Sequence, residues 1–252
     1  MSTVSIAAIE TAAEALYRAQ VTRRPCVPVA EYLGPSEIDA AYSTQQRLSE
    51  RRIASGARII GRKIGLTSAA VQRQIGVAQP DFGVLFDDMR YASDDLIPID
   101  RLLQPKAEAE VAFCWARTSM THPIAPQYVP QSPVPSRRWK SSTAASRIGR
   151  SGSPTPLPTT RRRVFVIGAE CTPLDQMNPI DVSMTMRRGD KVVSRGKGRD
   201  CLGDPLNALA WLAATAIEFG APLRAGDIVL SGALGPMITI EPRRRVHSRH
   251  HP

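Results

Sequence analysis

Apolar side chains in the first sixty residues recur at the spacing of an α-helix. Residues 5–20 and 35–56 both carry them three and four positions apart, so each segment would bury one stripe of its surface. The run RIIGRKIGLTS (58–68) then combines apolar and β-branched residues with glycine, which is typical of a strand that leads into a turn. We therefore expect a mainly helical N-terminal part over residues 1–60.

Beyond residue 60 the pattern is mainly that of strands. Strands are predicted within 79–89, at 106–116 and 164–170, in a hairpin over 182–198, and in a strand–turn–strand unit over 227–242. A short helix over 68–77 and an amphipathic helix over 204–220 lie between them. We expect one domain of 252 residues with an α+β fold, in which N-terminal helices precede a mixed β core over 61–242.

Positive charge is concentrated in two windows of the chain. Residues 118–163 contain eight Lys or Arg and residues 243–252 contain four Arg, and neither window has an Asp or Glu. Removing these twelve charges from the net +10 leaves −2 for the remainder of the chain. All four histidines also fall in the two windows, at positions 122, 247, 250 and 251. The main body is therefore mildly acidic and must carry out any chemistry without histidine.

Two interpretations of these anomalous basic segments stay open. With eight Pro and fourteen Ser or Thr, residues 118–163 have the composition of a disordered basic insert. Such a long loop is uncommon inside a compact domain. A DNA sequence that encodes Arg137 through Gly149 can also encode ALEIVDSRIADW when it is read in the frame two bases later. In the same way, DNA that encodes residues 243–252 can encode GDVFTAAIT in the frame one base later. Because both alternatives look like ordinary globular sequence, we expect that 118–163 and 243–252 are frame-shifted.

The composition also bears on the cellular compartment and on partners. The N-terminal twenty residues carry two Glu and a helical period, and no window has 18 uninterrupted apolar residues, so we expect neither a signal peptide nor a membrane span. The four cysteines are far apart and lack CxxC spacing, which favours reduced structural thiols in the cytoplasm. The charge alone would suggest a nucleic-acid-binding protein, but no aromatic interleaving or binding motif accompanies it, so we expect no nucleic acid partner.

The segment PKAEAEVAF (105–113) places two carboxylates in an otherwise apolar strand. Glu108 and Glu110 are two positions apart and therefore point to the same face of a sheet. Two like charges repel each other, and each is costly to bury without a positive partner. The pair therefore requires positive charge nearby, and from the residues alone this would come from Lys106 or an Arg on a solvated strand face.

Four segments resemble one known family. They are GRKIGLTSAAVQRQIGVAQPDFGVLF (61–86), PKAEAEVAF (105–113), CLGDPLNALAWLA (201–213) and LRAGDIVLSGALGPM (223–237). In this order they resemble the 2-hydroxypenta-2,4-dienoate (2-keto-4-pentenoate) hydratases of the fumarylacetoacetate hydrolase superfamily. The resemblance covers nearly all of the chain outside the two basic windows. The resemblance implies a β-rich core of the fumarylacetoacetase type and a homo-oligomer.

The resemblance also implies a divalent metal, Mg²⁺ or Mn²⁺, with Glu108 and Glu110 as ligands. Oxygen ligands of this kind suit a hard cation that keeps several waters. In the family a third carboxylate comes from a later strand. Its counterpart here is the Glu of ALEIVD in the shifted frame, whose codon straddles Trp139 and Lys140, so the third ligand is expected to be lost near that point.

Four further residues are site candidates by resemblance. Lys63 matches the active-site lysine, which would bind the substrate carboxylate or transfer a proton, with a plain surface lysine as the alternative. Asp81 is a candidate acid or base, or else a turn-capping residue. Ser231 and Gly232 resemble a turn that binds the substrate carboxylate, or else form an ordinary hairpin turn.

The family's reaction is the hydration of a 2-hydroxydienoate to 4-hydroxy-2-oxopentanoate in aromatic or steroid catabolism, with a small-molecule substrate. Three other functions stay open: a 2-oxo-3-hexenedioate decarboxylase of the same superfamily, an inactive relic, and a basic binding protein. The run QPDFGVLF favours the hydratase over the decarboxylase. A basic binding protein would retain nucleic acid in a salt-sensitive way through residues 118–163.

Overall fold

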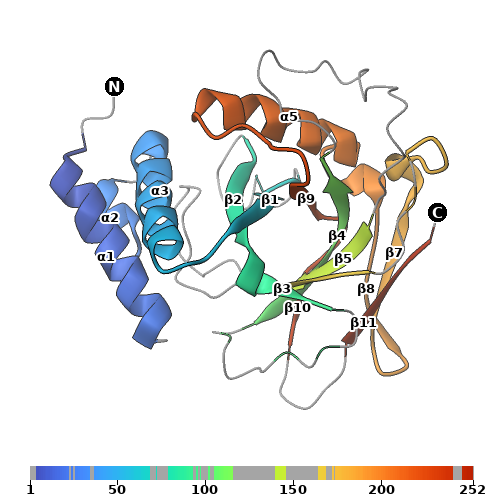
Figure 1. The fold of residues 1–252 in the computed structure, drawn as a ribbon. Helices are drawn as coiled ribbons and strands as arrows, with labels where there is room; N and C mark the ends of the chain where they lie inside the picture. The colour runs from blue at the N-terminus through green and yellow to red at the C-terminus, as the bar shows by residue number, and fades with distance from the viewer. Residues whose placement is uncertain are drawn as a thin grey trace.

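The computed structural model describes most of the chain outside the basic windows. The described residues are 4–22, 24, 26–34, 37–68, 72, 79–92, 95, 97, 102, 105–115, 140–145, 164–168, 172, 174–240 and 246–251, with the backbone alone for 140–145 and 246–251. Figure 1 shows N-terminal helices to one side of a β-rich body. This arrangement confirms the α+β fold with N-terminal helices that the sequence predicts.

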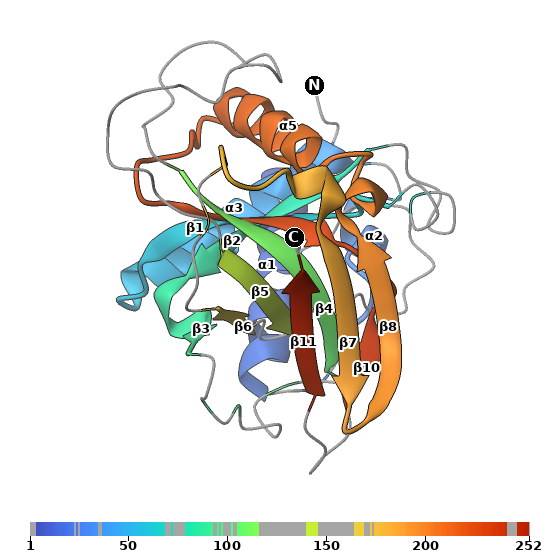
Figure 2. The ribbon, with the colours of Figure 1, turned by 90° about the vertical axis from the view of Figure 1, so that its right-hand side faces the viewer.

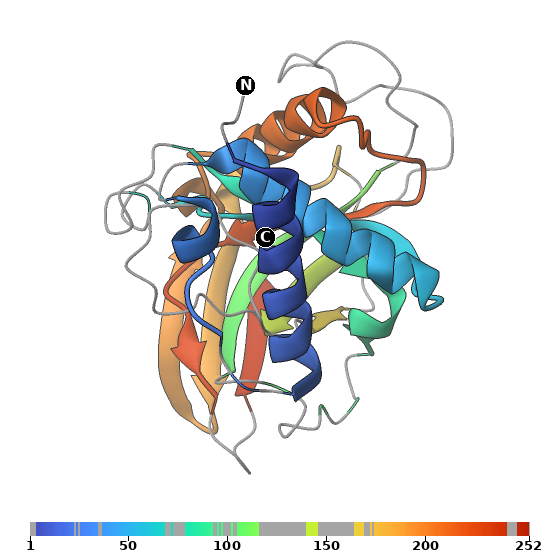
Figure 3. The ribbon, with the colours of Figure 1, turned by 90° about the vertical axis from the view of Figure 1, so that its left-hand side faces the viewer.

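Three helices form the N-terminal layer: α1 (Ile6–Thr22), α2 (Ala30–Leu33) and α3 (Ile38–Ala54). Small buried side chains of α1 and α3, among them Ala13 and Ala41, let the two helices pack closely around Leu16. Arg51 of α3 reaches Glu14 of α1 with 2.6 Å between Nη1 and Oε2. Figure 3 shows these blue helices in front of the strands, as a layer with its own small core.

The main sheet has the strand order β2-β1-β9-β4-β5-β6-β3, and β10 also pairs with β4. Its strands are β1 (Ile59–Gly65), β2 (Asp81–Phe86), β3 (Arg90–Tyr91), β4 (Lys106–Cys114), β5 (Lys140–Ala145), β6 (Val164–Ile167), β9 (Ile228–Ala233) and β10 (Ile238–Thr239). Within this sheet β1 pairs with β9 and β3 with β6 in parallel, and the other pairs are antiparallel. Strands from both halves of the sequence therefore lie next to each other at its centre.

A second sheet has the order β11-β7-β8, with β7 (Ser183–Arg188), β8 (Lys191–Lys197) and β11 (Val246–His251). Figure 2 shows these three strands in front of the main sheet. Short 3₁₀ helices occur at η1 (Asp87–Met89), η3 (Pro179–Asp181) and η4 (Gly198–Asp200). The second sheet contributes Met184 and Met186 to the largest core cluster.

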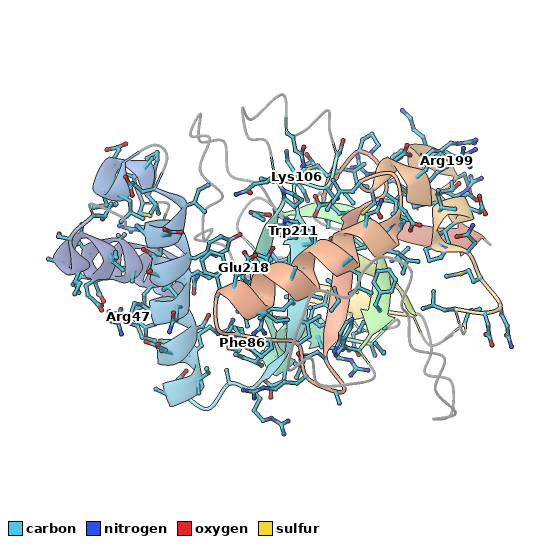
Figure 4. The ribbon with its side chains drawn as sticks, turned by 90° about the horizontal axis from the view of Figure 1, so that it is seen from above. Arg47, Phe86, Lys106, Arg199, Trp211 and Glu218 are labelled. Atoms are coloured by element: carbon cyan, nitrogen blue, oxygen red, sulfur yellow. The ribbon has the colours of Figure 1, made fainter. Side chains whose placement is uncertain are left out.

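Helix α5 (Pro205–Glu218) covers the main sheet, and Figure 4 shows it lying across the strands with Trp211 and Glu218 along it. Asp204 caps the helix by accepting a hydrogen bond from the Leu206 N–H at 2.8 Å, and Pro205 occupies its first turn. On the sheet face below, Val111 and Val229 pack with Leu212 of the helix. One face of the main sheet is thus an apolar core.

The predicted strands and helices are confirmed for the described part, with small differences in their ends. The strand predicted at 58–68 ends at Gly65, and the one predicted at 164–170 ends at Ile167. The helix predicted over 68–77 lies outside the described residues except for Ser68 and Gln72. None of the described helices is long and apolar enough to cross a membrane.

Parts of both basic windows take the backbone conformation of strands. Within 118–163, β5 pairs with β4 on one side and β6 on the other, and within 243–252, β11 pairs with β7. The remaining residues of these windows lie outside the described part. The division of the domain into 1–60 and 61–242, and the frame-shift interpretation of the windows, stay predictions.

We predict that Leu212→Ala lowers the free energy of unfolding by about 3 kcal/mol, because Leu212 is fully buried in the core cluster and its truncation leaves a cavity. Urea unfolding followed by circular dichroism measures this change. Leu209→Ala on the same helix is the matched control, since Leu209 is only partly buried and should cost clearly less. Equal losses in the two variants would contradict the packing of α5 described above.

Candidate active site

Three charged side chains meet on the face of the main sheet that lies opposite α5. Lys63 of β1 lies with its Nζ 3.7 Å from Glu108 Oε2 and 3.8 Å from Glu110 Oε1. Lys63 and Glu108 are 7% exposed, and Glu110 is fully buried. The sheet face is therefore buried rather than solvated, and among the described residues Lys63 brings positive charge next to both glutamates.

Strand order explains how Lys63 reaches the glutamates. Strand β9 lies between β1 and β4, and the register pairs Lys63 with Leu230 and Leu230 with Ala112. Residues paired in this way share one sheet face, so Lys63 lies on the face of Glu110, two strands away. The nitrogen–oxygen distances exceed those of a hydrogen bond, at roughly 3.2 Å, so the ammonium balances both carboxylates without a short bond to either.

A β-bulge in β9 supports Glu110. The register pairs Glu110 with Ala233 but Ala112 with Leu230, so Ser231 and Gly232 together lie opposite Val111. The Val111 N–H donates to Ser231 Oγ at 3.1 Å, and the Gly232 N–H donates to Glu110 Oε2 at 2.8 Å. The bulge thus turns one backbone N–H away from the strand ladder and toward the buried carboxylate.

Glycine is required at position 232 for two reasons. Its φ is +98°, in the region that L-residues rarely adopt. A Cβ at this position would also collide with the side chain of Thr67, which is 3% exposed. Thr67 therefore packs directly against the backbone whose N–H bonds Glu110.

Cys201 holds the other side of the bulge. Its thiol is fully buried and donates to the Ser231 carbonyl with 3.1 Å between sulfur and oxygen. Burial raises the pKa of the Cys201 thiol to about 12, so the thiol stays protonated and remains a donor at neutral pH. The sequence identifies Cys201 only as a structural thiol and does not single out Thr67. Both lie in segments that resemble the hydratase family, but only the fold brings them to the bulge.

The structure gives Ser231 and Gly232 internal hydrogen bonds. The Ser231 hydroxyl is fully buried, accepts from Val111 and donates to the Gly232 carbonyl at 3.1 Å. The Gly232 N–H donates to the Glu110 carboxylate. A substrate-binding role for the two residues stays a prediction, whereas their place next to Glu110 is a feature of the fold.

Asp81 lies at the start of β2, opposite Gly65 of β1. A Cβ on Gly65 would collide with the Asp81 carboxylate, so that carboxylate lies over the glycine. Residues paired across two antiparallel strands share a face, and Lys63 is two positions before Gly65. Asp81 therefore belongs to the same sheet face as Lys63, and its role as an acid or base stays a prediction.

The donor set of Glu108 and Glu110 fits a hard divalent cation. Both groups are buried carboxylates, and with Lys63 the described charges here sum to about −1 at a site shielded from solvent. Within the described residues, no group of three or more His, Cys, Asp or Glu side chains could hold a metal ion. The predicted loss of a third ligand near Trp139 and Lys140 stays a prediction, since Trp139 and the Lys140 side chain lie outside the description.

Comparison with known proteins decides the family. Residues 101–251 match the family model described as fumarylacetoacetate (FAA) hydrolase C-terminal. This chain belongs to the FAA hydrolase family. It is 41% identical to 2-keto-4-pentenoate hydratase 1 of Dechloromonas aromatica (strain RCB), over 96% of this chain and 92% of that protein. It is also 41% identical to 2-keto-4-pentenoate hydratase of Paraburkholderia xenovorans (strain LB400), over 92% of this chain and 87% of that protein.

Solved structures share the fold of this FAA hydrolase family member. The 4-oxalocrotonate decarboxylase from Pseudomonas putida G7, complexed with magnesium and adipate, matches with a TM-score of 0.87 at 22% identity, over 99% of this chain and 96% of that one. Fumarylpyruvate hydrolase from Pseudomonas aeruginosa, in complex with Mn²⁺ and pyruvate, matches with a TM-score of 0.53 at 15% identity, over 75% and 83%. The fumarylacetoacetase-type core predicted by resemblance is confirmed.

We predict that Gly232→Ala lowers the free energy of unfolding of this FAA hydrolase family member by more than about 2 kcal/mol, because it combines a strained φ with the Thr67 contact. Urea unfolding provides the measurement. Gly189→Ala is the matched control, since Gly189 also has a positive φ of 57° but a Cβ there meets nothing within 4 Å. The control should cost about 1 kcal/mol. A loss at position 232 no larger than at position 189 would contradict the bulge geometry.

Proposed function

We propose that this chain is a metal-dependent hydratase that adds water to 2-hydroxypenta-2,4-dienoate to give 4-hydroxy-2-oxopentanoate. The observation that carries the proposal is the 41% identity to proteins named 2-keto-4-pentenoate hydratase, which extends over more than nine tenths of the chain. The buried group of Lys63, Glu108 and Glu110 supports it from the structure. The proposal includes a cytoplasmic location and assembly as a homo-oligomer.

Glu108 and Glu110 are the residues that would hold the metal, which we propose to be Mg²⁺ or Mn²⁺. Solved structures with the same fold carry calcium, magnesium or manganese. When bound, such a cation supplies Lewis acidity toward the oxygens of a 2-oxo acid. The Gly232 N–H and the Lys63 ammonium fix the two carboxylates before any ligand arrives, which reduces the ordering needed on binding.

Proton transfers are the work of this chain's own residues. In the first stage the 2-hydroxyl loses a proton and C5 gains one, which gives an α,β-unsaturated 2-oxo acid. In the second stage the hydroxyl of water joins C4 and its proton joins C3. Because the body of the chain has no histidine, Lys63 and Asp81 on the same sheet face are the candidates for moving these protons. Lys63 is also suited to bind the substrate carboxylate.

A decarboxylase is the second candidate. The observation in its favour is the TM-score of 0.87 to 4-oxalocrotonate decarboxylase, but the 22% identity supports the fold alone. The two reactions differ in their product, since a decarboxylase acting on 2-oxo-3-hexenedioate releases carbon dioxide and a hydratase acting on the dienoate does not. Supplying both substrates and measuring carbon dioxide therefore separates them. We expect hydration of the dienoate and no carbon dioxide release.

We predict that Glu110→Gln and Glu108→Gln each lower kcat/KM for dienoate hydration at least about 100-fold, because each variant removes one anionic ligand from the buried pair. Loss of the dienol's ultraviolet absorbance in the presence of Mg²⁺ measures the rate, and EDTA should abolish it. Glu218→Gln, on the exposed end of α5, is the control and should leave the rate unchanged. Wild-type rates in both buried-site variants would refute the proposed function.

The register of β5 allows a separate test of the third ligand. Position 140 pairs with Ala112, and position 142 pairs with Glu110, so alternation places position 140 on the sheet face of the two glutamates. We propose that residues 118–163 and 243–252 are frame-shifted and that a carboxylate has been lost at this position.

We predict that Lys140→Glu tightens Mg²⁺ binding by about tenfold or more, because it replaces a positive charge with a carboxylate beside the predicted metal ligands. Isothermal titration calorimetry measures the affinity without requiring turnover. The matched control is Lys191→Glu, which makes the same charge change at an exposed position of β8 in the second sheet. Equal affinities of the two variants would show that the register argument is wrong.

A further inference from the structure

Helix α3 binds the first residues of β2 through two side chains on one of its faces. The Gln45 Nε2 donates to the Phe82 carbonyl at 3.2 Å, and the Phe82 backbone is close enough to the Tyr42 hydroxyl to lower its pKa slightly. Tyr42 and Gln45 are three positions apart, so they lie one turn from each other on the same helix face. Two consecutive turns of the N-terminal layer therefore contact a single residue of the sheet.

These contacts occupy the free edge of the main sheet. Strand β2 is the terminal strand in the order β2-β1-β9, so among the described residues no strand pairs with its outer edge. The Gln45 side chain takes the place of a strand neighbour at the Phe82 carbonyl, and the Tyr42 ring packs on the Phe82 ring beside it. Gln45 thus satisfies a backbone carbonyl that an edge strand otherwise leaves to water.

Ring contacts add to the Gln45 hydrogen bond. The Tyr42 ring stacks on Phe82 with 4.8 Å between centroids, and it meets Phe219, just beyond α5, at 4.4 Å. Such aromatic pairs contribute beyond their buried area. Burial raises the pKa of Tyr42, and the charge of Asp81 raises that pKa further, so the hydroxyl stays protonated at neutral pH.

Asp81 immediately precedes Phe82 in β2. Successive strand residues point to opposite faces, so holding Phe82 against α3 and the aromatic cluster directs Asp81 to the face of Lys63. The Asp81 carboxylate then lies over Gly65, where no Cβ blocks it. Its position is thus determined by α3 on one side and by a glycine of β1 on the other.

We propose that Tyr42 and Gln45 are positioning residues of the active site, which hold Asp81 in place for proton transfer to and from the substrate. The N-terminal helical layer is then part of the catalytic apparatus and not only a support for the β core. This inference rests on the proposed function through the role of Asp81 as acid or base. It assigns no contact between Tyr42 or Gln45 and the substrate.

The test compares Tyr42→Phe with Gln45→Leu in steady-state hydration assays with Mg²⁺. Tyr42→Phe keeps the ring contacts and removes only the hydroxyl, so the melting temperature should change by no more than about 4 °C. We expect kcat to fall about tenfold in each variant while KM and the calorimetric Mg²⁺ affinity stay within about twofold. Controls are Tyr17→Phe on α1 and Gln46→Leu on α3, which remove the same groups away from β2.

A double-mutant cycle with Asp81→Asn decides whether Tyr42 acts through Asp81. If it does, Tyr42→Phe should change the residual kcat of Asp81→Asn by less than about twofold, because the two residues act as one unit. If Asp81→Asn is no faster than buffer, the single variants decide instead. A fall in kcat with unchanged KM and Mg²⁺ affinity then supports the positioning role.

The remaining outcomes are also decisive. An equal fall in kcat with and without Asp81, or unchanged kcat in both single variants, would overturn the positioning role and leave the hydratase assignment intact. A wild-type chain without hydration, or an Asp81→Asn variant with full kcat, would refute the proposed chemistry itself and the positioning role with it. The single variants and Asp81→Asn thus separate the two failures.

Discussion

The site depends on the burial of two like charges on one face of one strand. Glu108 and Glu110 lie side by side because strand geometry places alternate side chains on the same face, and their burial weakens the screening of their repulsion by solvent. The Lys63 ammonium lies within 4 Å of both carboxylates, and the Gly232 N–H bonds one of them. Among the described groups this one ammonium faces two negative charges, so the described charges favour a further cation.

Much of the surrounding fold serves to hold this arrangement. The bulge in β9 frees the Gly232 N–H, and it persists because Ser231 replaces a carbonyl in the ladder and Cys201 bonds the Ser231 carbonyl. Thr67 fills the space above Gly232. These groups are neutral and buried, so they fix the geometry of a charged site without adding charge to it. Neutral side chains of α3 likewise contact the start of the edge strand β2.

Family membership and local geometry support different conclusions about function. The identity to proteins named as hydratases supports the reaction, whereas the solved structures at 22% identity or less support the fold only. The geometry adds what neither comparison contains: which groups surround the two glutamates in this chain and which elements hold Asp81. One basic window borders the site, because β5 lies beside β4 and places Lys140 opposite Ala112.

Sequence pattern by itself determined the elements and the pair of glutamates on one strand face. Helical and strand periods are local properties, so the helices in 1–60, the strand around Glu108 and the helix after Asp204 could be predicted from residue spacing alone. The resemblance to the hydratases likewise depended on short segments that stand intact in the chain. Only the tertiary structure decided that Lys63 supplies the balancing charge, that the Gly232 N–H bonds Glu110, and that α3 contacts β2. These contacts join residues far apart in sequence through strand order, one bulge and a helix packed on a sheet edge, and no local spacing encodes which strands become neighbours.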